Sequence, residues 1–344
     1  MLVSARADAE MRRDVEEGVR PRPEFLVLES RYGVELLDWT RVPGSRRGRS
    51  RLQSALHVAA ALPRVAHHEV VFSDGEHLGI PLALAMRSLG ITTPHLVIGH
   101  HLTTRTKARL LRRLRLYEGM TRILVHSSRQ HDLAHRTLGV PASKLAFVPY
   151  YADTDFWRPL DVPEQALIVA AGREHRDYLT MAAACSGLDA KVFVAAGSVH
   201  SPSAGVVSPE RWPVNFEVGF AGYTELRDLY GRASVVVVPV VDTDFQAGVT
   251  TLLEAMAMGK AVITTGASAQ GDIVRHGVSG ICVPPGDARE MRSAVAYLLG
   301  DDNARRTLGA AARQAVLTGY SVETYSARLA EHLMDLAAAA PAAA

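Results

Sequence analysis

From residue 24 onward, the apolar and polar positions of the chain alternate between two patterns. Short apolar runs, typical of buried strands, are followed by stretches whose apolar positions recur every three or four residues, as in amphipathic helices. Such strands separated by helices favour parallel sheets with helices on both faces. In the first half the pattern predicts strands at 25–30, 33–39, 69–74, 94–100, 122–127 and 144–150, and helices at 52–65, 77–90 and 106–119.

The pattern is interrupted at 151–165, where prolines and acidic residues gather, and it then restarts. We therefore predict an α/β fold of two Rossmann-like doubly wound domains facing a central cleft, because open parallel sheets bind ligands at the carboxyl ends of their strands. Three helices are predicted to close the chain. In the second half the predicted strands are 166–172, 190–197, 215–219, 235–241, 260–265 and 280–285.

These breaks predict the domain organisation. Residues 1–22 are polar and are predicted to be a flexible segment. The N-terminal domain, predicted to bind the acceptor, covers 23–150, a linker covers 151–165, and the C-terminal domain, predicted to bind the donor, covers 166–320. A last helix at 321–338 is predicted to pack back on the N-terminal domain, and the alanine-rich residues 339–344 are predicted to be a disordered tail.

Composition agrees with a two-domain cytoplasmic protein. The 344 residues are 48% hydrophobic and 22% charged, which allows two ordinary cores. Charges occupy the N-terminal positions where a signal peptide would need an apolar stretch, and the two cysteines are far apart, which favours free thiols in a reducing compartment. Residues 1–160 carry 24 Lys+Arg against 16 Asp+Glu, whereas the remainder carries 14 against 20, so the first half is expected to meet something anionic.

The segment from Asp244 to Gly259, DFQAGVTTLLEAMAMG, follows a buried strand and opens a helix. Gly248 permits a tight turn, and the next backbone N–H groups would point from a helix N-terminus, which favours an anion. Glu254 lies one turn further and would accept hydrogen bonds from ribose hydroxyls. The alternative is an ordinary amphipathic helix with a solvated glutamate. The residues expected to bind the donor here are Gln246, Ala247, Gly248, Val249, Thr250, Thr251 and Glu254.

This segment resembles the nucleotide-binding signature of the family-four retaining glycosyltransferases, which have the GT-B fold. The resemblance rests on Glu254, the following Ala-Met-Ala-x-Gly and the strand 260–265. It implies that the second glutamate of the signature, Glu254, holds the ribose. The first glutamate, which contacts the donor sugar in the family, is replaced by Gln246, which has no charge and adds an amide donor. The sugar therefore cannot be read from the signature.

Further matches follow the same order along the chain. AAGREHRDY (170–178) is similar to the family turn in which an arginine and a lysine hold the diphosphate. Arg173 matches the arginine, Tyr178 takes the place of the lysine, and Arg176 is the expected substitute. Residues 148–159 and 271–287 resemble two other family segments. The usual glycine-rich loop is missing, and its expected place holds SRYGVE at 30–35.

Histidines and acidic triplets are weaker candidates. His100 ends a predicted strand and matches a family histidine that touches the donor sugar; a capping or surface role is the alternative. The Asp-Thr-Asp triplets at 153–155 and 242–244 lack a second cluster of oxygen ligands, so no metal site is predicted. No other cofactor is expected beyond the nucleotide-sugar co-substrate, whose base is not identifiable from the sequence.

A basic amphipathic helix is predicted within 105–117. Leu110, Leu114 and Tyr117 form its apolar stripe, with Leu111 beside it, and arginines occupy the other face. Such a helix either packs with a solvated basic face or lies on an anionic membrane, which would place the protein peripherally at the inner face. No nucleic-acid-binding module is recognised.

The combined prediction is a metal-independent enzyme that transfers a sugar, with retention of anomeric configuration, from a nucleotide-sugar donor to a small-molecule, glycan or lipid acceptor. Retention is implied by the resemblance alone. The residues predicted to be catalytic are Gln246, His100 and Arg173. Two alternatives remain: a related GT-B epimerase, hydrolase or phosphorylase, and a binding subunit that has lost catalysis.

Overall fold

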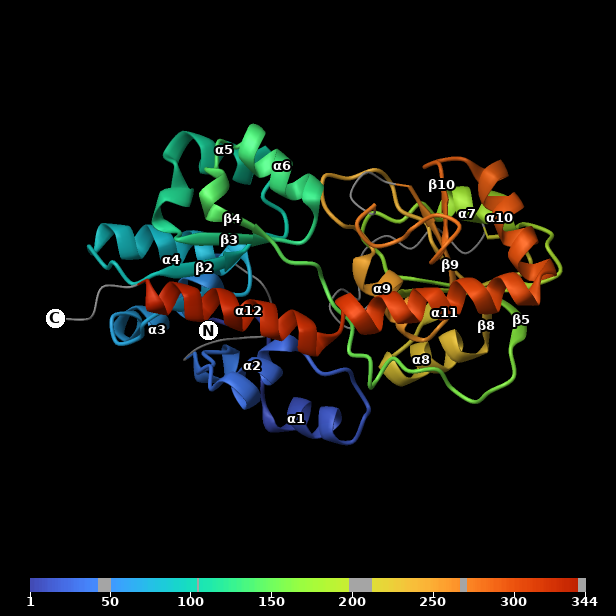
Figure 1. Ribbon diagram of the computed structural model, residues 1–344, viewed down its shortest axis with the longest axis horizontal. Coiled ribbons are helices and arrows are strands. Elements are labelled where there is room, and N and C mark those ends of the chain that lie inside the picture. Colours follow the sequence, from blue (N-terminus) through green and yellow to red (C-terminus); the bar gives the residue numbers. More distant parts are fainter. Residues whose placement is uncertain (43–50, 104, 198–211, 267–270, 340–344) are drawn as a thin grey trace. The chain divides into compact units, whose positions relative to one another are not determined.

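The structure is a computed structural model that describes residues 1–42, 51–103, 105–197, 212–266 and 271–339. It divides into two compact units (Figure 1). Unit 1 contains Met1–Glu16, Arg22–Pro149 and the chain from Glu323 onward, and unit 2 contains Glu17–Pro21 and Tyr150–Val322. The tail predicted at 339–344 lies outside the described residues from 340 on.

Unit 1 is built on four parallel strands. They lie side by side in chain order, as β1 (Val71–Ser73), β2 (His95–Ile98), β3 (Arg122–Val125) and β4 (Leu145–Phe147). The first three strands are almost entirely buried, as their continuous apolar runs require. The helices of this unit are α1 (Ala9–Glu16), α2 (Glu24–Tyr32), η1 (Trp39–Arg41), α3 (Arg51–Val65), α4 (Glu76–Ser88), α5 (Arg105–Leu114), η2 (Leu116–Gly119), α6 (Ser128–Arg136), η3 (Ala142–Lys144) and α12 (Val322–Ala338).

The first residues extend this sheet, whereas the sequence predicted a flexible segment at 1–22. Leu2 forms parallel bridges with both Ser73 and Leu37. Its N–H donates to the carbonyl of Phe72 at 2.7 Å, and Val3 is fully buried. The flexible prediction is wrong for these residues, because an apolar run of three residues is too short for its period to be recognised.

Residues 25–30 were predicted as a strand and form part of helix α2. Phe25, Val27 and Leu28 are buried, so the apolar run was recognised but its geometry was not. Short apolar runs fit a strand and a buried helix equally well. Pro23 precedes the helix, and Gly33 ends it in the left-handed conformation at φ 66°. Within the predicted strand 33–39, Leu37 forms an isolated bridge with Leu2. The segment SRYGVE at 30–35 therefore covers the end of helix α2 and does not follow a strand, as the family's glycine-rich loop would.

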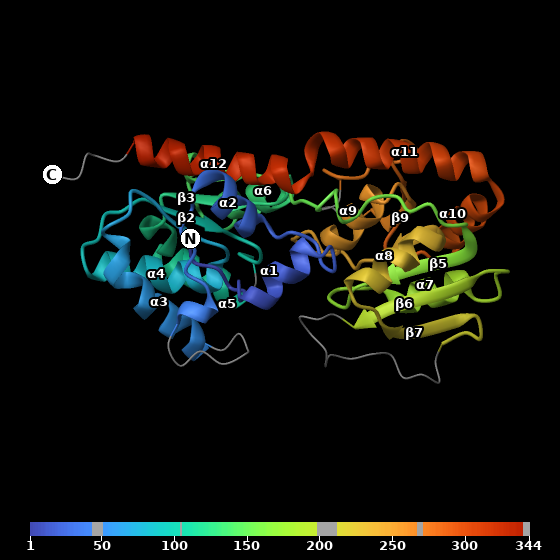
Figure 2. The same ribbon diagram turned by 90° about the horizontal axis from the view of Figure 1, so that it is seen from below.

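Unit 2 has the strand order of a dinucleotide-binding fold. Its six parallel strands lie in the order β10-β9-β8-β5-β6-β7, and β5, β6 and β7 are seen side by side in Figure 2. Numbered from its first strand, this is the order 6-5-4-1-2-3 of the doubly wound Rossmann sheet. The strands are β5 (Gln165–Ala171), β6 (Lys191–Gly197), β7 (Phe216–Phe220), β8 (Ala233–Val238), β9 (Ala261–Thr265) and β10 (Ile281–Val283).

Helices cover both faces of this sheet. Along β8, Val235 and Val237 belong to one core cluster, and Val236 and Val238 belong to the other. Successive side chains of a strand point to opposite faces, so all four valines are buried only because both faces are covered. The helices of unit 2 are α7 (Tyr178–Cys185), α8 (Tyr223–Arg232), α9 (Val249–Ala257), α10 (Ala288–Gly300) and α11 (Asp302–Gly319).

The predicted linker at 151–165 contributes to the core of unit 2. Trp157 is 1% exposed and Phe156 is 5% exposed, and both belong to the cluster that contains Tyr230. The ring of Phe156 stands edge-on to that of Trp157, with centroids 4.8 Å apart. Proline and acidic residues therefore mark an irregular segment here, but its aromatic residues are anchored in the unit.

Candidate functional site

The topology of unit 2 points to the carboxyl ends of two central strands, β5 and β8, as a candidate ligand site. Strands β5 and β8 are neighbours, but the chain leaves β5 toward β6 and β7, and it leaves β8 toward β9 and β10. Ligands of such sheets bind at the carboxyl ends of the strands where the order reverses. The turn after β5 contains Arg173 and Arg176, and the loop after β8 contains Gln246 and Gly248.

The turn after β5 is folded around the side chain of Arg176. Its Nε donates to the carbonyl of Ala171 at 3.0 Å, one Nη donates to the carbonyl of Glu174 at 2.8 Å, and the other donates to Oγ1 of Thr251 at 3.3 Å. Gly172, at φ 95°, is required because a Cβ there would collide with this guanidinium group. Burial lowers the pKa of Arg176. Arg176 thus joins the β5 turn to helix α9.

Arg173 presents its guanidinium group differently. Its Nε and one Nη are buried, and neither has a hydrogen-bond partner among the described residues. A buried guanidinium N–H without an acceptor costs free energy. The described residues supply no acceptor for these two nitrogens.

The loop after β8 places a second unpaired side chain at the same edge of the sheet. Gln246 is 7% exposed, and neither its amide nitrogen nor its amide oxygen has a partner in the described part of the chain. Native proteins satisfy most buried polar atoms, so each exception requires an explanation. A bound molecule with both hydrogen-bond donors and acceptors would satisfy this amide.

Gly248 connects the loop to helix α9. It lies at φ 80°, and a Cβ at this position would be 2.9 Å from Cγ1 of Val238 and 3.1 Å from Nη1 of Arg176. Only glycine combines this conformation with such close packing. Gly248 is the N-cap residue, and it has no side chain that could accept from the N–H groups of Val249, Thr250 and Thr251.

Glu254 lies on the second turn of α9 and is 7% exposed. Burial raises the pKa of its carboxyl group to about 8, and Arg176 opposes this shift. No hydrogen bond to the carboxyl group is formed within the described residues. Tyr230, which is fully buried on α8, has its pKa raised well above its usual value by burial, and Glu254 contributes to that shift. Sequence reasoning missed Tyr230, because a tyrosine in an amphipathic helix carries no distinguishing signal.

The two loops are held together by backbone contacts. The N–H of Val241 donates to the carbonyl of His175 at 3.0 Å, and the N–H of Asp177 donates to that of Pro239 at 2.9 Å. The rings of His175 and Phe245 meet edge-on, with centroids 5.0 Å apart. His175 also adopts a left-handed conformation, at φ 55°. The predicted donor-binding residues therefore lie on one connected framework.

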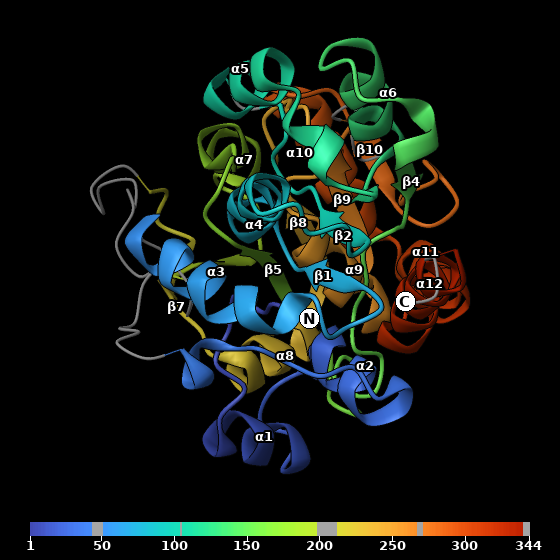
Figure 3. The same ribbon diagram turned by 90° about the vertical axis from the view of Figure 1, so that its left-hand side faces the viewer.

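His100 belongs to unit 1. It lies two residues after the end of β2. Helix α4 packs against β1 and β2 (Figure 3). Its N–H donates to the buried carboxylate of Glu76 at 2.9 Å, and its Nε2 lies 2.9 Å from the carbonyl oxygen of Asp74. This bond assigns the proton to Nε2. The role predicted for His100 at a donor sugar stays a prediction.

The side of helix α5 that faces the core differs from the apolar stripe predicted for it. Leu111 is fully buried, whereas Leu114 is 54% exposed. The core-facing side is therefore rotated from the predicted one. The side chains of Arg105, Thr106, Lys107 and Leu110 lie outside the described residues, and the exposed basic residues are Arg109, Arg112, Arg113 and Arg115.

Two further properties concern metals and membranes. Among the described residues, no group of three histidine, cysteine or acidic side chains is arranged to hold a metal ion. In the Asp-Thr-Asp triplet at 153–155, Oδ1 of Asp153 accepts a hydrogen bond from the N–H of Asp155 at 3.3 Å. No helix in the described ranges is both long and apolar enough to cross a bilayer.

Comparison with known proteins places this site in a family domain. Residues 166–301 match the family model of glycosyl transferases group 1. Over 108 residues the chain is 37% identical to a D-inositol 3-phosphate glycosyltransferase from Thermobispora bispora, covering 31% of this chain and 24% of that protein. Over 86 residues it is 35% identical to an exopolysaccharide phosphotransferase from Streptomyces coelicolor, covering 25% and 9%. The chain thus spans about a quarter or less of these curated relatives.

Solved structures resemble most of the chain. Sucrose-phosphate synthase from Thermosynechococcus elongatus superposes with a TM-score of 0.73 at 19% identity, covering 88% of this chain and 84% of that one. HepE from Anabaena, in complex with UDP-glucose, gives 0.70 at 15% identity, covering 97% and 98%. The protein has the GT-B fold. The α/β fold predicted from the sequence is therefore confirmed, and residues 166–301 are its glycosyl transferases group 1 domain.

The group 1 domain contains every predicted donor-binding residue, from Arg173 to Glu254. It spans strands β5 to β10, and so the whole Rossmann sheet of unit 2. The framework described above is thus the part of the chain that the family model recognises.

Proposed function

We propose that the protein is a nucleotide-sugar-dependent glycosyltransferase whose donor site is the carboxyl edge of β5 and β8 in unit 2. The observation that carries this proposal is the set of buried, unpaired polar groups at that edge, on Arg173 and Gln246. Gln246 lies in the loop that leads into α9, and Arg173 lies in the turn after the neighbouring strand β5, at the point where the strand order reverses. The group 1 domain supports the same assignment.

The donor diphosphate would lie against the N-terminus of α9. The helix N–H groups from Val249 to Thr251 and the unpaired nitrogens of Arg173 would donate to its oxygens. Arg176, already bonded to Thr251, would act mainly through its charge and by holding the turn in place. These groups would also stabilise the negative charge that develops on the departing diphosphate.

Glu254 and Gln246 would bind the two ends of the donor. Glu254 would accept hydrogen bonds from the ribose hydroxyls, and the amide of Gln246 would face the sugar. UDP is the first nucleotide to test, because HepE was solved with UDP-glucose. Uridine specificity of this chain is part of the proposal.

Retention is proposed on the family-four resemblance alone, and metal independence is proposed because the sequence offers other groups that can balance the diphosphate charge. The acceptor hydroxyl would attack the face from which the diphosphate leaves, and an oxygen of that diphosphate would take the proton. Two arginines and a helix N-terminus can balance the diphosphate charge. His100 is proposed to touch the donor sugar, as its family counterpart does.

The acceptor and the place of action are also proposals. Acceptor binding is assigned to unit 1, which contains most of residues 1–160, where 24 Lys+Arg stand against 16 Asp+Glu. The exposed arginines of α5 are suited to an anionic membrane surface, and Leu114 beside them is 54% exposed. We therefore propose a cytoplasmic protein that acts on a small-molecule, glycan or lipid acceptor, with peripheral contact to the inner membrane face.

The test is calorimetric titration of the purified protein with UDP, GDP and ADP, with and without magnesium. Micromolar binding of one nucleotide, equal with and without metal, is expected. Glu254→Ala should weaken this binding by about 10- to 150-fold, the effect of losing a buried charged hydrogen bond. Absence of binding to all three nucleotides would exclude the donor site.

Product analysis with the matching nucleotide sugar distinguishes the alternatives. A glycosyltransferase releases the nucleotide only slowly until an acceptor is added. Rapid hydrolysis or epimerisation without an acceptor would indicate the rival enzyme class. Binding without turnover of any donor and acceptor pair would indicate a binding subunit.

A further inference from the structure

The side chain of Gln130 joins two loops at the carboxyl ends of the neighbouring strands β2 and β3 in unit 1. Gln130 lies in the first turn of α6 and is 5% exposed. Its Nε2 donates to the carbonyl oxygen of His100, in the loop after β2, at 2.7 Å. Its Oε1 accepts from the N–H of His126, the residue directly after β3, at 3.2 Å. One buried amide therefore holds the two loops together.

Part of this arrangement is an ordinary helix cap. Ser127 is the N-cap residue of α6, and its Oγ accepts from the N–H of Gln130 at 3.1 Å. A serine followed three residues later by glutamate or glutamine is the pattern of a capping box, in which the longer side chain accepts a hydrogen bond from the backbone. Capping requires only an acceptor, whereas the contact with the carbonyl of His100 requires a donor. Glutamine has both groups, and ionised glutamate has only the acceptor.

His100 is held at its carbonyl, its N–H and its ring. Besides the contact from Gln130, the buried carboxylate of Glu76 accepts from the N–H of His100 at 2.9 Å. The carbonyl oxygen of Asp74 accepts from Nε2 of the imidazole, also at 2.9 Å. Because the ring proton is on Nε2, Nδ1 is the nitrogen that can accept a hydrogen bond from a hydroxyl group. The loops after β1 and β2 and helix α6 thus fix both the place of His100 and its tautomer.

We infer that Gln130 is a positioning residue for glycosyl transfer, which holds the loop of His100 so that its imidazole meets the donor sugar. This inference rests on the proposed function, which places His100 against that sugar. A displacement of about 1 Å in a group that orients a substrate can lower the rate about 100-fold. The donor that Gln130 supplies to His100 is therefore expected to matter for the rate of transfer, in addition to the stability of α6.

Three variants separate positioning from capping. Gln130→Glu keeps the capping box and, when ionised, lacks the donor to His100. Gln130→Leu removes both the donor and the acceptor. Lys144→Met is the matched control for loss of buried backbone contacts, because Nζ of Lys144 donates to three backbone carbonyls between residues 117 and 120, at 3.4, 3.3 and 2.5 Å. These contacts precede β3 and β4, at the other end of the same sheet.

The measurements use the full chain. Calorimetry first shows which of UDP, GDP and ADP binds to the wild type. The rate of nucleotide release is then measured with UDP-glucose, GDP-mannose or ADP-glucose accordingly, from pH 5 to pH 9, for the wild type and the three variants. Circular dichroism checks folding, and urea unfolding measures the stability that each variant loses. If Gln130→Leu does not fold, Gln130→Glu alone decides.

We expect both substitutions of Gln130 to lower kcat at pH 9 by about 10- to 100-fold without a change in nucleotide affinity. Relative to the wild type, Gln130→Glu should recover activity toward pH 5, because a protonated carboxyl group can donate to the carbonyl of His100 as the amide does. Gln130→Leu should show no such recovery. Lys144→Met should lose stability but keep the wild-type kcat.

The opposite outcomes are equally distinct. Wild-type kcat at pH 9 in folded Gln130→Glu would overturn the inference, leave Gln130 as a helix cap and leave the proposed function intact. A loss of kcat in Lys144→Met equal to that in the Gln130 variants would also overturn it, because general destabilisation would then explain the effect. If the wild type binds no nucleotide, or binds one without turnover, the proposed function fails and this inference fails with it.

Discussion

Glu254 is a carboxyl group that the fold encloses without a hydrogen-bonding partner among the described residues. Its burial on α9 disfavours the charged form, which raises its pKa to about 8. In the unfolded chain the same group has its ordinary pKa of 4.5. Between these two values the folded state binds a proton that the unfolded state does not. The ligand-free protein should therefore lose stability as this proton is removed.

This gives a prediction for the pH dependence of stability. The contribution that protonated Glu254 makes to the free energy of unfolding is fully present below pH 4.5 and is lost progressively up to about pH 8. Glu254→Gln keeps the shape but does not titrate. The melting temperature of the wild type minus that of Glu254→Gln should therefore fall steadily from pH 5 to pH 8, measured without ligand. A constant difference across this range would contradict the raised pKa.

Gln246 gives a second prediction at the residue scale. Its amide is buried and has no partner among the described residues, which costs about 1–3 kcal/mol in the ligand-free protein. Gln246→Met replaces the amide with an apolar chain of similar length. We expect this variant to be more stable toward urea by about 1 kcal/mol and to lose glycosyl transfer. A less stable variant would mean that the protein itself satisfies the amide.

At the scale of elements, the junction between β8 and α9 depends on Gly248. An alanine there has both an unfavourable φ and a Cβ that approaches Val238 and Arg176. Gly286, at φ 76°, has nothing within 4 Å of the position where a Cβ would stand. Gly286→Ala is therefore a matched control that carries the conformational cost alone.

We expect Gly286→Ala to destabilise the protein by roughly 1 kcal/mol and Gly248→Ala by about 1–3 kcal/mol more, measured by urea unfolding. Gly248→Ala should also lose nucleotide affinity, because Arg176 must move. Equal effects of the two substitutions on stability and binding would show that the close packing at Gly248 is not required.

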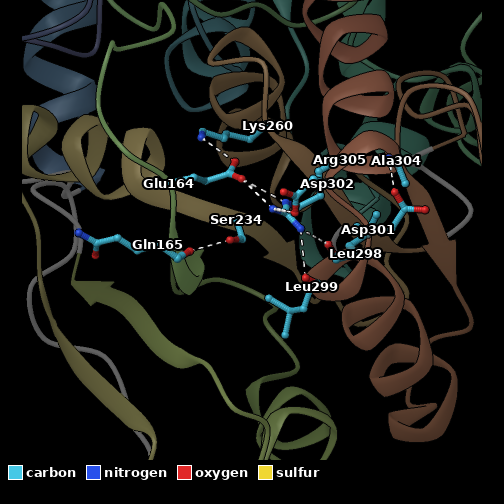
Figure 4. A network of polar contacts seen from close by, with 10 residues as sticks. All are labelled: Glu164, Gln165, Ser234, Lys260, Leu298, Leu299, Asp301, Asp302, Ala304 and Arg305. Carbon is cyan, nitrogen blue, oxygen red and sulfur yellow. Dashed lines mark hydrogen bonds and ion pairs between the residues drawn. The ribbon is translucent and has the colours of Figure 1, made fainter.

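A network of charged side chains lies at the amino ends of β5 and β9 in the same sheet and is drawn in Figure 4. The carboxylate of Glu164 accepts from Nε and Nη2 of Arg305, at 3.1 and 3.0 Å, and lies 3.4 Å from Nζ of Lys260. The side chains of Arg305 and Lys260 are only 10% and 13% exposed. Glu164 thus balances two nearly buried cations where β5 begins and α11 starts.

Glu164→Ala should destabilise the protein by roughly 1–2 kcal/mol in urea unfolding, because Lys260 and Arg305 both lose the carboxylate of Glu164, although Arg305 keeps that of Asp302. Asp302 is the control. It contacts the same Arg305 at 2.5 Å, but its side chain is 71% exposed, so Asp302→Ala should cost about 0.5 kcal/mol or less. If Asp302→Ala costs as much as Glu164→Ala, burial is not the reason for the effect.

At the scale of the whole molecule, the chain consists of two units with separate cores. The final helix α12 joins unit 1, so unit 1 is complete only when the last part of the chain has been made. All proposed donor-binding residues except His100 belong to unit 2. A nucleotide should therefore stabilise one unit directly.

Scanning calorimetry should reveal this asymmetry. We expect two components in the unfolding of the ligand-free protein. A cognate nucleotide at 100 times its Kd should stabilise unit 2 by about 2.7 kcal/mol and shift mainly its component. Equal shifts of both components would indicate that the units unfold together, and no shift would contradict nucleotide binding.

The sequence by itself determined the elements with strong patterns. Valine-rich runs such as 235–238 can be buried on both faces only in a covered parallel sheet, so fold class and strand positions followed from them. The helix opened by Gly248 and containing Glu254 was equally evident, because a glycine between a strand and an amphipathic helix has few other conformations. The segment predicted to bind the donor was singled out for the same reason.

Only the tertiary structure decided the features that depend on contacts between distant segments. The run 25–30 became a helix, and Leu2 joined the sheet, because packing and not local pattern determines the geometry of short apolar runs. Arg176 is bonded to Thr251, whereas the buried polar atoms of Arg173 and Gln246 have no partner among the described residues. The bond from Arg176 to Thr251 joins residues 75 positions apart, which no periodicity can record.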